Sequence, residues 1–279
     1  MNLDRLAAAK LWLVSEQTAD LPYLAHALYA LVPVACGDVP TMTVDEQWRL
    51  YVNPDWLATA PVPVVGHELA HLAWHLLAEH ADRARDLHVD ATTAGHWHTA
   101  ADATVARTLD DAGLPYESLR DAAELGLPPD LSTEEYYAML SGLPVESPES
   151  GAGGLPPTEG CGSGSDGVRR AHELPPDVDL GGVDREAATQ IRRRVAIEYR
   201  EHVTTRGLVP GEAGRWATRI LEPRIAWEPL LAGAVRRAVG WTNGRADYTY
   251  ARPSRRASSL PRVVLPGVRR PLPRVAVVV

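Results

Sequence analysis

Apolar residues recur at intervals of three and four along much of the chain, which predicts a mostly helical protein. The first such segment is Leu3–Gln17. Another opens at Ser132-Thr133-Glu134-Glu135, a capping-box sequence that starts a helix running through Leu140. Two short segments between these two predicted helices have the composition of strands. The strands are Thr41–Asp45 and Trp48–Asn53, and the remaining helices are expected over about Asp20–Val32, Val64–His80, His98–Asp111, Asp184–Thr205, Arg215–Leu221 and Trp227–Val239.

The pattern and the composition together divide the chain into four parts. Residues 1–141 hold the expected sheet, and residues 142–172 are so rich in Gly, Ser and Pro that we expect a flexible linker. A helical region over 173–244 should pack on the first part. Residues 245–279 are extended and end in an apolar run typical of a central strand of a parallel sheet, so we expect them to lead into a domain that this chain lacks. The expected fold class is α+β, mostly α.

Charge and cysteine content narrow the function classes. Residues 1–150 carry 23 Asp and Glu against 7 Lys and Arg, whereas residues 151–279 carry 13 against 21. The acidic half should repel phosphates, and the arginines of the second half are scattered among acidic residues, so no nucleic acid is expected as a partner. Two cysteines, no signal peptide and no long apolar run favour a cytoplasmic protein that does not enter a membrane.

The motif that carries chemistry is His67-Glu68-Leu69-Ala70-His71, within the helix expected from Val64. Residues four apart lie on one face of a helix, so both imidazoles of an H-E-x-x-H sequence can reach one metal ion. Zinc in such a site lowers the pKa of its bound water to roughly 7, and the glutamate accepts the proton as the water attacks a carbonyl. The sequence therefore predicts a zinc site with His67 and His71 as ligands and Glu68 as the general base.

A catalytic zinc ion needs a third protein ligand and an open position. His75 continues the spacing, but it lies about 12 Å along the helix axis from His67, too far to share an ion with it. We therefore expect His75 and His80 to be supporting or surface residues. His96, His98 and Asp102, on or near the next helix, remain the candidates for the third ligand.

These residues resemble a known family. Gly66–His71, followed some 30 residues later by Trp97-His98-Thr99-Ala100-Ala101-Asp102, is similar to bacterial metallopeptidase-like proteins in which a "W-N-x-A-A-D" helix supplies an aspartate ligand. Trp227, Arg252–Arg256, Leu265-Pro266-Gly267 and the terminal Val275–Val279 match as well, so the resemblance covers nearly the whole chain.

The resemblance implies that Asp102 is the third ligand and that Val275–Val279 leads into a von Willebrand A-like domain. It also implies a partnership with a MoxR-type AAA+ ATPase. The chain departs from the family where His98 replaces an asparagine and where Ala106 stands at the place of another. His98 therefore remains the alternative third ligand.

Cys161 lies between two glycines in the Gly- and Ser-rich stretch. A lone cysteine there is usually inert. The alternative is that its thiolate caps the zinc ion as a fourth, inhibitory ligand and holds the enzyme latent. Cys36, which follows an apolar helix, is expected to fill the core.

Together these features predict a zincin-like domain that hydrolyses peptide bonds in protein substrates. Trp48–Asn53 is expected to be the edge strand that pairs with an extended substrate. The rival hypothesis is an inactive, metal-stabilised interaction module that works with the AAA+ ATPase. Glu68 favours catalysis, because a structural zinc site needs no general base.

Overall fold

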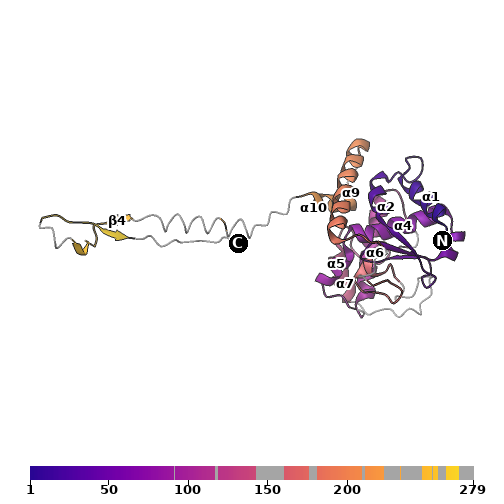
Figure 1. Cartoon of the computed structure of the whole chain (residues 1–279), viewed down its shortest axis with the longest axis horizontal. Coiled ribbons are helices and arrows are strands. Elements are labelled where there is room, and N and C mark those ends of the chain that lie inside the picture. The colour runs from indigo at the N-terminus through magenta and orange to yellow at the C-terminus, as the bar shows by residue number, and fades with distance from the viewer. Residues whose placement is uncertain are drawn as a thin grey trace. The chain divides into compact units, whose positions relative to one another are not determined.

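The computed structural model describes residues 1–90, 92–116, 119–142, 160–175, 181–208, 211–222, 233, 247–252, 254–256 and 262–269. The chain forms two compact units, Met1–Glu222 and Pro223–Val279. Helices dominate the first unit, which also holds a small sheet, so the fold is α+β and mostly α (Figure 1). The elements described in this unit are α1 (Leu3–Val14), the 3-10 turn η1 (Pro22–Leu24), α2 (Ala25–Ala30), β1 (Val32–Ala35), β2 (Met42–Val44), β3 (Arg49–Val52), α3 (Pro54–Thr59), α4 (Val62–Leu77), α5 (His80–Asp86), α6 (Ala94–Asp111), α7 (Thr133–Ser141), α8 (Ser163–Asp166), α9 (Arg185–Arg206) and α10 (Glu212–Leu221).

The helix predictions are largely confirmed, with shifts at the ends. The capping box of α7 is present: the Ser132 hydroxyl accepts from the Glu135 backbone, and the Glu135 carboxylate accepts from the Ser132 backbone. The Asp184 carboxylate caps the start of α9 by accepting from the Ala187 backbone. The predicted helix Trp227–Val239 lies almost entirely outside the described residues.

The small sheet has the order β1-β3-β2, with β1 parallel and β2 antiparallel to β3. The expectation that Trp48–Asn53 is an edge strand is therefore wrong, because β3 is central and all four of its residues are buried. The strand β1 was not predicted. It begins two residues after α2 ends at Ala30, and such a short apolar run cannot be distinguished from a buried helix by periodicity. Pro33 makes a continued helix unfavourable.

Helix α4 forms the middle of the first unit. Its residues from Leu69 to Leu77 are all buried, which is typical of a helix with neighbours on every side. It contacts α1, α2, α6, α8 and β2. The close approach of α1 requires Gly66, because a Cβ atom there would lie 2.6 Å from Cε3 of Trp12. The core position of this part of α4 places His71 and His75 out of reach of bulk water.

Of the expected flexible linker over residues 142–172, residues 143–159 lie outside the described residues. Residues 160–175 pack within the first unit, against β2 and α6. The Val44 N–H donates to the carbonyl oxygen of Cys161 over 2.9 Å, and Nε1 of Trp97 donates to that of Ser165 over 2.9 Å. Glu173 accepts from the Ser163 backbone over 2.7 Å. The glycines here provide close contact rather than flexibility, since a Cβ atom at Gly162 would lie 2.3 Å from the Val44 oxygen.

This close contact predicts that Gly162→Ala destabilises the protein more than Gly113→Ala. Both glycines have positive φ, +87° and +73°, but a Cβ atom at Gly113 would meet nothing within 4 Å. Strained backbone of this kind costs roughly 1–3 kcal/mol, so Gly113→Ala isolates the backbone cost and Gly162→Ala adds the clash with Val44. Thermal unfolding followed by circular dichroism compares the two, and equal shifts would contradict the packing role of Gly162.

The second unit contains the strand β4 (Asp247–Thr249), which pairs antiparallel with β5 (Gly267–Arg269). The predicted terminal strand Val275–Val279 lies outside the described residues. No helix in the described parts of the chain is long and apolar enough to cross a membrane.

Candidate metal centre

Two histidines of α4 approach each other in the core. His71 and His75 are one turn apart, and their Nε2 atoms are separated by 2.8 Å. The exposed fraction is 5% for His71 and 0% for His75. The i,i+4 spacing places both rings on one face of the helix.

Helix α6 brings a carboxylate to the same point. Oδ1 of Asp102 lies 3.2 Å from Nε2 of His71 and 3.1 Å from Nε2 of His75. Its other oxygen, Oδ2, lies 3.2 Å from Nε2 of His98, one turn earlier on α6. The neighbours Ala101 and Ala103 are small and fully buried, which allows α6 to pack closely within the core.

The fourth group is the Cys161 thiol, with Sγ at 3.3 Å from Nε2 of His71. Cys161 is buried, and its backbone is fixed by the hydrogen bond from Val44. On its other side Gly160 lies against the His98 ring, where a Cβ atom would be 3.2 Å from Cε1. The thiol is therefore held in place by β2 and α6.

The four donor atoms of His71, His75, Asp102 and Cys161 all lie within 4.8 Å of one another. Nε2 of His71 has three of these groups around it, yet it carries at most one hydrogen, so hydrogen bonds alone do not account for the convergence. Zinc bonds to nitrogen at roughly 2.0–2.1 Å and to sulfur at about 2.3 Å, which places tetrahedral ligand atoms roughly 3.3–3.6 Å apart. The contacts of 2.8–3.3 Å are close to those edges. This donor set fits a tetrahedral metal ion.

The electrostatics of the cluster also indicate a place for a cation. Burial opposes protonation of His71, but Cys161, Asp102 and Glu68 outweigh it and raise its pKa well above the usual value. Burial lowers the pKa of His75 to about 4 and raises that of Cys161 to about 12. Surroundings that favour a positive charge on His71 also favour a metal cation, and binding of the ion displaces the protons of its ligands.

Glu68 lies beside the cluster. Its carboxylate accepts from the Thr41 hydroxyl over 2.8 Å and from the Tyr116 hydroxyl over 2.7 Å. Oε2 also lies 3.8 Å from Nδ1 of His71, on the side of the ring away from Nε2. Burial opposes ionisation, but contacts with His71, Tyr116 and Thr41 hold the pKa of Glu68 below its usual value. The carboxylate is therefore ionised at neutral pH.

The structure leaves three of the predicted or considered ligands, His67, His96 and His98, outside the cluster. Nδ1 of His67 lies 2.7 Å from the Pro63 oxygen, and its ring packs between Trp12 and Tyr116. His96 is on α6 but is not one of the four converging residues. None of these contacts supports His67 as a ligand, and that assignment stays a prediction. His98 contacts Asp102 rather than the other donor atoms, so its role as the alternative third ligand also stays a prediction.

Sequence reasoning missed His75. We expected it to be a supporting or surface residue because it is too far from His67, but the residue that approaches it is His71. The signal was present in the sequence, since His71-Leu72-Ala73-Trp74-His75 repeats the i,i+4 spacing one turn later. The first pair, His67 and His71, was favoured because it has a glutamate next to its first histidine.

Comparison with protein-family models agrees with a metal centre. A family model described as "Putative metallopeptidase domain" matches residues 3–269.

The chain belongs to this family. The match includes all four residues of the cluster as well as Glu68. The chain matches no curated protein and no solved structure. The chain belongs to a metallopeptidase-domain family and has a buried cluster of His, Asp and Cys. These two features support the broad class of metal-dependent hydrolases.

Proposed function

We propose that this domain binds one zinc ion through His71, His75, Asp102 and Cys161 and is a latent peptidase with a zincin-like fold. The convergence of the four donor atoms carries the proposal. Two imidazoles, a carboxylate and a thiolate are all ligands that zinc accepts in tetrahedral sites. The substrate class would be proteins or peptides.

A bound zinc ion would polarise a peptide carbonyl and lower the pKa of a coordinated water to roughly 7. The residues of the chain have separate tasks in this scheme. His71, His75 and Asp102 fix the position of the centre. Glu68 is ionised and is the carboxylate beside His71, so it would accept the proton from the attacking water. Catalysis also needs an open position, and Cys161 fills it.

The position of Cys161 supports latency in a second way. One side of β2 pairs with β3, whereas on the other side the Val44 N–H donates to the Cys161 carbonyl. Extended peptides bind to exposed strand edges by such backbone hydrogen bonds. The Cys161 segment therefore lies along the strand edge that an extended substrate would use, while its thiol lies where the reacting group would be. Activity would require this segment to leave.

The residue after His71 is a leucine, and this favours a second candidate function, a metal centre without catalysis. In an H-E-x-x-H site the glutamate follows the first ligand, but here that residue is Leu72, which is 1% exposed and packed in the core. Glu68 lies one turn earlier, beside Nδ1 of His71. An inactive, metal-stabilised interaction module would have such a closed centre, with Glu68 orienting His71. For this module we propose a cytoplasmic location, a MoxR-type AAA+ ATPase as its partner and an associated von Willebrand A-like domain. Co-purification with such an ATPase would test the partnership.

The proposal predicts that the protein, purified without chelators, contains close to one equivalent of zinc. X-ray absorption should show one sulfur at about 2.3 Å and the remaining ligands at about 2.0–2.2 Å. Because the ion joins residues from α4, α6 and the Cys161 segment, its removal by a chelator should lower the unfolding temperature. Protein reloaded with zinc serves as the control. A preparation that holds no first-row transition metal, and binds none when it is supplied, would overturn the metal centre.

A further inference from the structure

A line of hydrogen bonds runs from the cluster to the backbone of α6 through three buried side chains. Nδ1 of His75 lies 2.9 Å from Nδ1 of His80, and Nε2 of His80 lies 3.4 Å from the Thr133 hydroxyl. The Thr133 hydroxyl lies 3.1 Å from the Thr104 hydroxyl, which in turn donates to the Ala101 carbonyl over 2.8 Å. His80, Thr133 and Thr104 come from α5, α7 and α6.

The far end of this line fixes the direction of every hydrogen bond in it. A carbonyl oxygen only accepts, so the single hydrogen of the Thr104 hydroxyl goes to Ala101. The Thr133 hydroxyl must then donate to Thr104. With its own hydrogen used, Thr133 can only accept from His80, which places a hydrogen on Nε2 of His80.

The state of His75 follows from that of His80. In the part of the chain that the structure describes, the His80 ring is hydrogen-bonded to His75 and Thr133, and it is 1% exposed. A buried ring without a carboxylate partner is neutral, since an isolated buried charge is strongly unfavourable. Nδ1 of His80 therefore carries a lone pair and accepts from Nδ1–H of His75. His75 is left with a lone pair on Nε2, the atom that faces His71 and Asp102.

We infer that His80 and Thr133 are positioning residues that hold His75 in the tautomer able to bind a metal ion through Nε2. This inference rests on the proposed metal centre. Histidine ligands usually donate their second ring hydrogen to a carboxylate, a carbonyl or water. Here that acceptor is the ring of His80, whose own orientation depends on Thr133.

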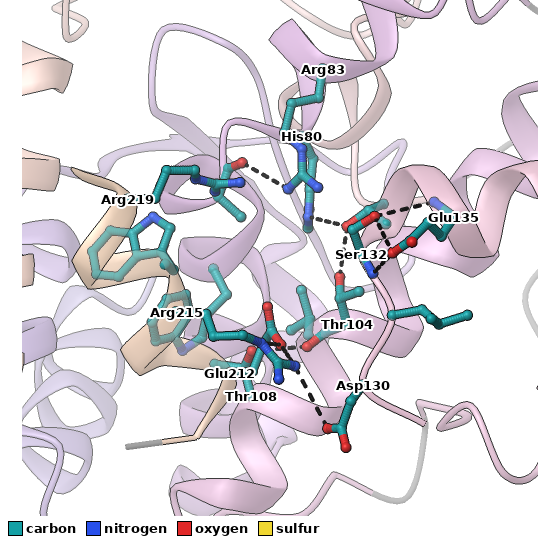
Figure 2. Close-up of a pocket in the computed structure, with 16 residues that line it drawn as sticks. His80, Arg83, Thr104, Thr108, Asp130, Ser132, Glu135, Glu212, Arg215 and Arg219 are labelled. Atoms are coloured by element: carbon teal, nitrogen blue, oxygen red, sulfur yellow. Dashed lines mark hydrogen bonds and ion pairs between the residues drawn. The ribbon is translucent and has the colours of Figure 1, made fainter. Parts of the chain in front are cut away.

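The side chains of this line also border a cavity. His80, Thr104 and Thr133 also line a cavity of about 350 Å³ whose other lining residues include Arg83, Arg215 and Arg219 (Figure 2). These side chains therefore lie between a polar cavity and the buried centre. A ring at position 80 with the opposite tautomer would leave His75 without an acceptor at Nδ1.

The test compares variants that differ in one hydrogen-bonding group. His80→Leu removes the acceptor for His75, whereas the side-chain oxygen of His80→Asn can take the place of Nδ1. Thr133→Val removes the hydroxyl with little change of shape. Thr108→Val is the matched control, because Thr108 is a buried threonine of α6 that donates to the Thr104 carbonyl and lies outside the line.

Zinc affinity is measured by competition with a chelator, and ring tautomers by nitrogen-15 NMR. His80→Leu and Thr133→Val should weaken zinc binding by roughly 10- to 100-fold, His80→Asn by less, and Thr108→Val not at all. His80 should show hydrogen on Nε2 and His75 on Nδ1. Unchanged zinc affinity in both His80→Leu and Thr133→Val, or hydrogen on Nδ1 of His80, would overturn the inference. The tautomer of His80 is measurable in metal-free protein too. A wild-type chain that binds no zinc would refute the metal centre, while the NMR result still decides the direction of the line.

Discussion

His75→Ala should abolish zinc binding, whereas His67→Ala should leave most of it. His75 is fully buried, and its Nε2 lies 3.1 Å from Oδ1 of Asp102, within the four-residue cluster. The His67 ring instead contacts Trp12 and Tyr116 and bonds to the Pro63 oxygen. Loss of a direct ligand should exceed the roughly 10- to 100-fold loss that is typical of outer contacts. Metal content after dialysis and chelator competition both measure the difference.

The two variants control for each other, because each removes one imidazole from the same helix. His75→Ala leaves a cavity in the core, so its folding is checked by circular dichroism, and His75→Gln offers a less disruptive second variant. The opposite ranking, with zinc lost in His67→Ala and kept in His75→Ala, would show that the metal binds the H-E-x-x-H pair after all. The rings of α4 would then have to rearrange when the ion binds.

Cys161→Ser should convert a chain with no measurable peptidase activity into one that hydrolyses casein, if the centre is a latent catalytic one. Removing the thiol opens the fourth position, and His71, His75 and Asp102 remain as the three protein ligands of a catalytic zinc site. The backbone of residue 161 can still bond to Val44, so a thiol-modifying reagent on the wild-type chain gives an independent way to displace the segment. Cys36→Ser is the matched control and should change nothing, because Cys36 is not part of the cluster.

Glu68→Gln in the Cys161→Ser background separates the two candidate functions. If Glu68 accepts the proton of the attacking water, hydrolysis should fall by roughly 10²- to 10⁴-fold while zinc content stays the same. If Glu68 only orients His71, zinc affinity should fall as well. Cys161→Ser protein that retains zinc but does not hydrolyse unstructured proteins would favour the inactive interaction module.

The sequence could predict which kinds of residue form the site, but not which histidines lie together in it. The helical spacing of the histidines and the position of Asp102 on the following helix could be inferred from sequence, the latter through a family resemblance. Which pair of histidines meets Asp102 depends on the rotation of α4 about its own axis, which is set by its packing against α1, α2 and α6. Spacing alone does not contain that rotation, so it could not show that His75, rather than His67, lies beside Asp102 in the structure.

The fold shows a similar division. Ser132 and Asp184 marked the starts of α7 and α9 because their side chains bond to nearby backbone N–H groups, an interaction local in sequence. The place of β3 in the middle of the sheet depends on β1 and β2 and could not be inferred locally. The glycines around Cys161 suggested flexibility, whereas Gly162 is needed because the Val44 oxygen leaves no room for a side chain.

The docking of residues 160–175 has a consequence for variation in chain length. Both ends of the connection between α7 and the Cys161 segment are fixed, one by the capped helix ending at Ser141 and the other by Val44 and Trp97. Because Val44 and Trp97 hold the Cys161 segment from its own side, a change in the number of residues between Ser141 and Gly160 should leave the four donor atoms in place.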